Sequence, residues 1–282
     1  MLKAQRGYTI VEVLIVLTVS SVLFFGVYSI FAPRRQGVEF SQGIYDVQSK
    51  IEQLANQVST GNFLEVTSYT CAQNAITQRP SLTASGSAVR TNSNQDCIYL
   101  GKALQPVIGS SDMYIYDILG LRNVHSGLSD TGESVQTIAE AKPEPAGSVN
   151  GAGNFQYLYS DKYTVPNGLK IISAKTNGSS GGILKLYSTL QNNNTSARGI
   201  SAYSSNYTYQ AGDEQPSNGA NETSSRLRNC IEEISACTTV YPLEVNGWTL
   251  CLQGTDNTHT ATLVVKPSAT GIVTKLTVTA CS

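Results

Sequence analysis

One acidic residue stands out among the residues that could do chemistry, because it lies inside an apolar run. Glu12 is the only charged residue between Tyr8 and Ala32. A carboxylate near the centre of a bilayer costs roughly 2.5 to 3.5 kcal/mol on insertion scales, so such a residue is usually kept because it has a partner. The chemistry expected of Glu12 is therefore pairing with a cation in or beside the membrane. The alternative is that it is an incidental polar residue in a simple membrane anchor.

The cysteines are a second group of reactive residues, and all of them lie beyond the apolar run. An even number of cysteines in this position indicates an oxidising compartment and a set of disulfides, whereas the alternative is free thiols buried in a cytosolic core. The six candidates are Cys71, Cys97, Cys230, Cys237, Cys251 and Cys281.

The chain has few residues of the kinds that bind metals or cofactors or catalyse reactions. There are two histidines, His125 and His259, and no C-x-x-C pair, so the sequence predicts no metal site. It contains no nucleophile elbow, phosphate-binding loop or H-E-x-x-H helix, and we expect neither a cofactor nor an enzyme activity. The formal net charge of -1 excludes a global attraction to polyanions, so whether a local nucleic-acid site exists stays open.

The run that contains Glu12 predicts a membrane-spanning helix. As a helix, residues 8–32 would extend about 37 Å, enough to cross a bilayer. Lys3 and Arg6 precede the run and favour a cytoplasmic N-terminus with an exported C-terminus, although Arg34 and Arg35 on the far side oppose this. A secretory signal peptide is the competing reading, but its apolar region covers only about 7 to 15 residues.

The helix is expected to continue outside the membrane with one apolar face. Apolar residues recur there at steps of three and four, a spacing that places them along one stripe: Ile44, Val47, Ile51, Leu54 and Val58. A free coiled coil would need more heptads than this segment has, so we expect the stripe to pack on a sheet of the same chain. Gly61 and Asn62 are the expected end of the helix.

The N-terminus resembles the class III signal of type IV prepilins and type II secretion pseudopilins. The resemblance rests on a short basic leader that ends in Gly7, followed by Tyr8-Thr9-Ile10-Val11-Glu12 and the apolar helix. It implies that a membrane prepilin peptidase cuts after Gly7 and methylates the new amine of Tyr8. It also implies that Glu12 and Tyr8 act in assembly, since the carboxylate can neutralise the amine of a neighbouring subunit. The chain departs from the family in having Tyr8 where Phe or Met is commoner, and Ser29 where many pilins have proline.

The expected organisation follows from these segments. Residues 1–7 form the cleaved leader, 8–35 the transmembrane and filament-core helix, 36–60 its amphipathic continuation, and 61–282 a β-rich exported head. The expected fold class is α+β, with the long N-terminal helix packed on an antiparallel sheet as in pilins. Breaks between subdomains are expected near 141–154, which is rich in Pro and Gly, and near 191–224, which is polar. The second segment is read either as a solvated loop or as an exposed adhesive loop.

Within the head the clearest strands are C-terminal, at 248–253, 260–266 and 272–280. Further strands are expected at 113–119, 155–160, 169–173 and 183–189, and a short helix at 225–236. In such a helix Cys230 and Cys237 would lie about 10 Å apart, too far for a disulfide to each other. We expect Cys71 to pair with Cys97, which leaves the other four to tie this helix to the C-terminal strands. The resemblance to pilins suggests instead a C-terminal disulfide between Cys251 and Cys281.

The function expected is that of a structural filament subunit. Because the head is larger than in typical major pilins, a minor or tip-proximal pilin serving adhesion, motility or DNA uptake is favoured. The alternatives are a pseudopilin of a type II-like secretion system and a ligand- or DNA-binding module displayed on a pilus. The partners implied are other pilin subunits, the prepilin peptidase and the assembly platform in the membrane. The implied location is the cytoplasmic membrane, crossed once, and then the extracellular pilus at the cell surface.

Overall fold

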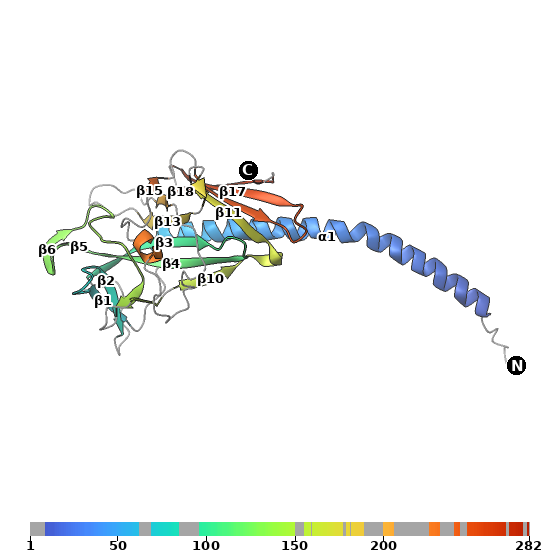
Figure 1. Ribbon diagram of the computed structural model, residues 1–282, viewed down its shortest axis with the longest axis horizontal. Coiled ribbons are helices and arrows are strands. Elements are labelled where there is room, and N and C mark those ends of the chain that lie inside the picture. Colours follow the sequence, from blue (N-terminus) through green and yellow to red (C-terminus); the bar gives the residue numbers. More distant parts are fainter. Residues whose placement is uncertain are drawn as a thin grey trace.

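A computed structural model describes most of the chain. The described residues are 9–61, 69–84, 96–149, 155–158, 160–176, 179–180, 182–188, 200–205, 226–231, 240–242, 247–268, 271–278 and 281. They form one long helix that projects from a β-rich head, with the N-terminus far from the head (Figure 1). Strands predominate in the head and the long helix forms a separate element, so the α+β class is confirmed.

The helix α1 runs without interruption from Ile10 to Thr60. It ends where the sequence predicted, because Gly61 adopts the left-handed conformation (φ 64°) and its N–H bonds to the carbonyls of Gln57 and Val58. Its N-terminal half curves, whereas the half inside the head is straighter (Figure 1). The helix contains Pro33, and a proline inside a helix removes one backbone hydrogen bond and favours a bend of the axis.

Two antiparallel sheets form the body of the head. The larger has the order β10-β4-β3-β13-β14-β15, with β7 paired to β4, and the other has the order β12-β11-β16-β17-β18. The strands of the larger sheet are β3 Cys97–Pro106, β4 Asp112–Leu121, β7 Glu144–Pro145, β10 Ser160–Thr164, β13 Ile183–Ser188, β14 Ile200–Ser205 and β15 Val240–Pro242. Those of the other are β11 Lys170–Thr176, β12 Ser179–Ser180, β16 Trp248–Gln253, β17 Thr260–Ser268 and β18 Gly271–Thr277.

The apolar stripe of α1 lies between these sheets, as expected. All five stripe residues are at most 2% exposed and share a core cluster with residues of both sheets, among them Leu104 and Trp248. At about 25 cal/mol per Å² of apolar surface, this burial is what holds the helix in the head. The amphipathic half of α1 is therefore a part of the head, and only its N-terminal half projects.

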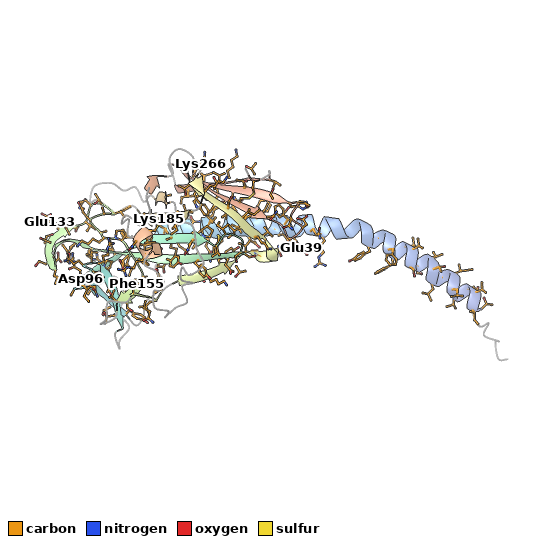
Figure 2. All side chains as sticks on the ribbon, in the orientation of Figure 1. Glu39, Asp96, Glu133, Phe155, Lys185 and Lys266 are labelled. Atoms are coloured by element: carbon orange, nitrogen blue, oxygen red, sulfur yellow. A yellow bond between two sulfur atoms is a disulfide. The ribbon has the colours of Figure 1, made fainter. Side chains whose placement is uncertain are left out.

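A second core lies on the opposite face of the larger sheet. Tyr116, Tyr187 and Phe155 are each at most 1% exposed there, together with Ile231 of the short helix α2, Arg226–Ile231. Three small hairpins complete the head: β1 Tyr69–Gln73 with β2 Pro80–Ala84, β5 Asn123–Ser126 with β6 Ser129–Ser134, and β8 Gly147–Val149 with β9 Phe155–Tyr157. The first two lie at the end of the head opposite the projecting helix (Figure 1), and Figure 2 labels Glu133 on β6.

Several sequence expectations need correction. The segment expected at 141–154 as a break is part of the head over 141–149, because β7 pairs with β4 and Ala141, Glu144 and Ala146 are buried. The single strand expected at 155–160 is two strands: β9 pairs with β8, and β10 pairs with β4. Within the second expected break, β14 is part of the larger sheet and pairs with β13 and β15, whereas residues 191–199 and 206–224 lie outside the described residues. Residues 225 and 232–236 of the expected helix also lie outside them.

Buried charges are a feature that the sequence did not predict. Lys102 and Asp117 face each other across β3 and β4 and form an ion pair that is at most 6% exposed. Burial raises the pKa of Asp117, and the Lys102 ammonium opposes that rise. Glu144 is 1% exposed and lies between Arg228, at 3.1 Å, and Arg79, at 3.9 Å, so it links α2 and the start of β2 to β7.

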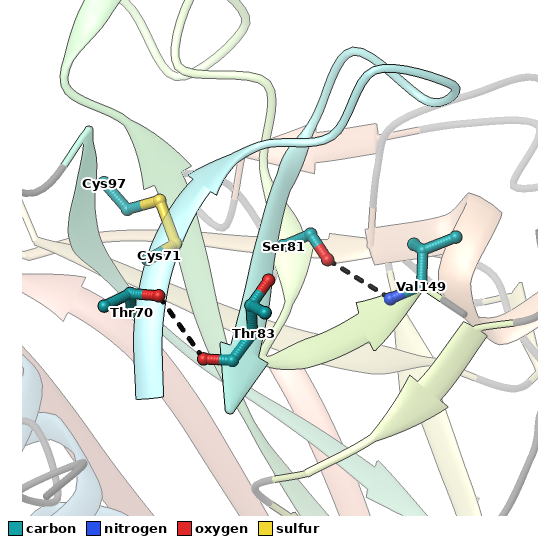
Figure 3. The surroundings of a disulfide bond; sticks show 6 residues. All are labelled: Thr70, Cys71, Ser81, Thr83, Cys97 and Val149. Carbon is teal, nitrogen blue, oxygen red and sulfur yellow. Dashed lines mark hydrogen bonds between the residues drawn. A yellow bond between two sulfur atoms is a disulfide. The ribbon is translucent and has the colours of Figure 1, made fainter. Parts of the chain in front are cut away.

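The disulfides connect strands that lie far apart in the sequence. Cys71 on β1 is bonded to Cys97 on β3, the expected pairing, with a Cα–Cα distance of 5.7 Å. Figure 3 shows this bond beside the hydrogen bonds from Thr70 Oγ1 to the Thr83 carbonyl and from Val149 N–H to Ser81 Oγ. The disulfide thus anchors the β1–β2 hairpin to the larger sheet.

A second disulfide joins Cys251 to Cys281, with a Cα–Cα distance of 5.9 Å. It lies within the C-terminal part of the chain, where Cys281 Sγ is 3.9 Å from the Ala261 carbonyl of β17. The pairing of Cys251 with Cys281 that the resemblance suggested is therefore confirmed, and the expectation that these cysteines tie the short helix to the C-terminal strands is wrong. Cys230 is disulfide-bonded, and Cys237 lies outside the described residues.

Candidate processing and assembly site

The first turn of α1 is closed by a reciprocal pair of hydrogen bonds between Thr9 and Glu12. Thr9 is the N-cap residue, and its Oγ1 accepts a bond of 3.2 Å from the Glu12 N–H. The Glu12 carboxylate in turn accepts bonds of 3.3 Å from the Thr9 N–H and from the Thr9 hydroxyl. This capping box satisfies backbone donors that the helix itself leaves unpaired.

The capping box fixes where the Glu12 carboxylate points. The acid faces back along the helix towards the amide that joins Thr9 to Tyr8. This is also the positive end of the helix dipole, which stabilises a carboxylate. A role for Thr9 was not among the predictions, although its T-x-x-E spacing with Glu12 is the sequence signature of a capping box. Glu12 therefore has polar partners within its own chain at the start of the helix.

An apolar helical segment follows this turn directly. Over Ile10–Tyr28 the helix is long and apolar enough to cross a membrane, and none of it is buried against the head. Its large side chains are open, with Phe24 and Phe25 exposed by 72% and 73%. Burying so large an apolar surface is strongly favourable, so this segment requires lipid or other helices around it.

Two hydroxyl groups in this segment, those of Thr18 and Ser21, are satisfied within the helix. Thr18 Oγ1 donates to the Ile15 carbonyl at 2.9 Å, and Ser21 Oγ donates to the Leu17 carbonyl at 2.7 Å. Such back-bonding removes the cost of a bare hydroxyl in hydrocarbon. The polar residues of the span thus do not conflict with a position inside a bilayer.

A collar of two head segments surrounds α1 where it leaves the head. We use this name for residues 166–169 and for the β16–β17 turn, residues 254–259. Asn167 Nδ2 donates to the Glu39 carbonyl at 2.8 Å, and the Phe40 ring lies 5.5 Å from the His259 ring. Figure 2 labels Glu39 at this exit point. The collar fixes the position along α1 at which the head begins.

The remaining predicted site residues fall into two groups. The stripe residues of α1 lie together in the core, as described above. Lys3, Arg6, Gly7 and Tyr8 lie outside the described residues. Within the described ranges, no group of three or more His, Cys, Asp or Glu side chains is arranged to hold a metal ion.

Comparison with known proteins identifies the N-terminal segment. Residues 2–28 match the family model of the prokaryotic N-terminal methylation motif. Neither a curated protein nor a solved structure matches the chain. The match covers the leader, the capped turn and the exposed apolar helix, and it does not extend into the head.

These findings have direct consequences for how the chain is handled in a cell. A pilin-type motif implies processing by a prepilin peptidase and assembly with pilin subunits. The motif and the apolar helix together indicate membrane anchoring. The chain thus carries a type IV pilin-like prepilin signal, which supports a type IV pilin- or pseudopilin-like protein.

Proposed function

We propose that this protein is a minor or tip-proximal pilin of a type IV pilus-like filament. Prepilin peptidase removes residues 1–7 after Gly7 and methylates the amine of Tyr8. The mature subunit is held in the cytoplasmic membrane by its single span until the assembly platform inserts it into a filament that extends to the cell surface. Its role is structural, and no reaction is assigned to the head.

The capping box at Thr9 and Glu12 is the observation that carries this proposal. Thr9 holds the Glu12 carboxylate within 3.3 Å of an amide nitrogen that is one residue from the amine created by cleavage. In the free subunit the acid is satisfied by Thr9. In a filament the cationic amine of a neighbouring subunit becomes its stronger partner, because an ion pair in a low-dielectric bundle gains more than a neutral hydrogen bond.

The exposed span supplies the second half of the argument. Its apolar side chains have no cover from the head. Lipid covers them in the membrane, and the spans of neighbouring subunits cover them in a filament. Charge pairing then sets the register between subunits, while packing of the spans supplies the cohesion.

The head supports a specialised position in the filament. It comprises roughly 220 residues, which is the size of a full domain. Disulfides hold it together, and two hairpins lie at the end farthest from the span (Figure 1). A subunit with so large a head suits a tip or a low-abundance position better than dense packing along a shaft. Adhesion, motility and DNA uptake are the roles open to such a subunit.

The test compares Glu12→Ala with Glu12→Gln in cells that produce the filament. Both variants should be cleaved and reach the membrane, because neither changes Gly7 or adds a charge to the apolar span. Glu12→Ala should enter filaments roughly tenfold less or worse, since the amine of the neighbour is left unpaired. Glu12→Gln keeps the hydrogen bonds of the capping box and should also assemble poorly, because it lacks the charge.

Three outcomes would contradict the proposal. Normal incorporation of both variants would remove the charge-pairing argument. A native protein whose N-terminal mass retains the leader, or a Gly7→Ala variant that still begins at Tyr8, would remove the processing step. Immunogold labelling that places the protein only in the periplasmic filament of a secretion system would assign it to the pseudopilins instead.

A further inference from the structure

The collar lies close to the membrane surface if the span occupies the bilayer. The apolar run ends at Ala32, and Gln36 is the first helix residue beside the collar, lining a pocket with Asn167 and Thr255. Four residues of helix correspond to about 6 Å. The headgroup layer of one leaflet is about 5 to 8 Å thick. The head therefore begins at the depth of the phospholipid headgroups.

The length of the apolar run brings the collar closer still. As a helix the run from Tyr8 measures about 37 Å, whereas the hydrocarbon layer measures about 30 Å. A span that is too long tilts, and tilt lowers one side of the attached head towards the surface. Because α1 curves, the head is not coaxial with the span (Figure 1).

The chemistry of the collar suits a layer of phosphates. The acidic residues in and beside the collar already have partners. Glu39, on α1 beside the collar, is paired with Arg35 at 2.7 Å. Asp256, in the collar, is bonded to His259 and Thr258. Lys170, next to the collar at the start of β11, is exposed and makes no ion pair with any described residue. The surface charge that is left without a partner is thus cationic.

The collar is also polar rather than apolar at its surface. Thr255, Asn257 and Thr258 are exposed, whereas Leu169 is 1% exposed and packs into the core. Among the described residues of the collar, no large apolar side chain is exposed. Such a surface has hydrogen-bond donors for phosphate oxygens and nothing to insert into hydrocarbon.

We propose that the collar and Lys170 rest on the headgroups of anionic phospholipids while the subunit waits in the membrane. Lys170 is the cation that contacts the phosphates, and the Thr255 hydroxyl and the Asn257 side-chain amide of the β16–β17 turn donate further hydrogen bonds. This contact orients the head on the membrane before assembly. The inference rests on the single-pass anchoring of the proposed function, and it adds the lipid partner.

The test uses the full chain in nanodiscs of phosphatidylglycerol and phosphatidylcholine. A fluorophore is attached to an introduced cysteine at Thr255 in the collar, at Leu128 in the distal hairpin, or at Val22 in the span. Headgroup-attached nitroxide lipids should quench the label at Thr255 several-fold more than the label at Leu128. Lys170→Glu should lower quenching at Thr255 at least twofold, and Lys275→Glu, a matched exposed lysine on β18, should leave it unchanged.

Each remaining outcome decides against the proposal in a distinguishable way. Quenching at Thr255 that is unaffected by Lys170→Glu would mean that the helix alone places the collar near the surface, and would overturn the headgroup contact. Equal quenching at Thr255 and Leu128, with Val22 quenched by chain-attached nitroxides, would overturn the contact but keep the anchor. An unquenched label at Val22 would overturn the anchor and the contact together.

Discussion

Substitution of two glycines in α1 tests the close contact between this helix and the collar. Gly37 and Gly43 both lie in the interior of the helix, so helix propensity alone predicts that replacing either with alanine stabilises the protein by up to about 1 kcal/mol. A Cβ at Gly37 would meet nothing within 4 Å. A Cβ at Gly43 would lie 2.8 Å from Leu169 Cδ1 and 3.3 Å from the Pro166 carbonyl oxygen.

The relative sizes of the overpacking cost and the gain in helix propensity decide whether Gly43→Ala stabilises or destabilises the head. Leu169 is 1% exposed, so it cannot swing into solvent to make room, and overpacking a core costs about 1 to 3 kcal/mol. After subtracting the gain in propensity, Gly43→Ala should destabilise the head by about 0 to 2 kcal/mol. Gly37→Ala should change the free energy of unfolding by about 0 to 1 kcal/mol in the stabilising direction.

The assay is urea unfolding of the full chain in detergent with its disulfides intact, followed by tryptophan fluorescence. Trp248 is the only tryptophan and lies in the same core cluster as the helix stripe, so it reports on the packing of α1 in the head. The two variants should differ by about 1 to 3 kcal/mol. Equal stabilisation by both alanines would refute the close contact between Gly43 and the collar.

Three further predictions concern the head. Glu144→Ala leaves two arginines around a buried site without their acid and should destabilise the head by about 3 to 5 kcal/mol, which lowers the urea midpoint. An unchanged midpoint would show that the contacts of Glu144 with the two arginines are not buried. Replacing Cys71 and Cys97 by serine opens a loop with a sequence separation of 26 and should lower the free energy of unfolding by roughly 3 to 4 kcal/mol in the same assay. A decrease below about 1 kcal/mol would contradict the disulfide. The hydrogen bond from Asn123, with a second from the Gly132 N–H, lowers the pKa of Asp130. Stability from this bond is therefore present above the unfolded pKa of about 3.9 and is lost as pH falls through the lower folded value, and Asn123→Ala should raise the pKa of Asp130 in a carboxyl NMR titration. An unshifted titration would disprove the hydrogen bond.

Strand prediction in the head succeeded where the pattern was strong and local. The strand expected at 248–253 has the bounds of β16, and those expected at 113–119 and 183–189 lie within one or two residues of β4 and β13. The long central strand β3 was missed, because it carries Lys102 and Gln105 at buried positions and a bulge between Tyr99 and Gly101. Such residues do not show the alternation that marks a half-buried strand.

The features of the N-terminal segment could be predicted from the sequence by itself. The leader, the carboxylate of Glu12, the apolar span and the stripe of α1 depend on local order along the chain and on the contrast between oil and water, which a linear pattern records. The match at residues 2–28 and the burial of the stripe agree with that reading.

The tertiary structure alone decided what meets across the head. Three such contacts each join residues from separate strands or segments: Glu144 with Arg228, Lys102 with Asp117, and Leu169 with Gly43. Cysteine spacing and charge counts leave such partners open, because many chain paths bring different pairs within reach. Only a fixed set of strand registers, held by the burial of two cores, selects one of them.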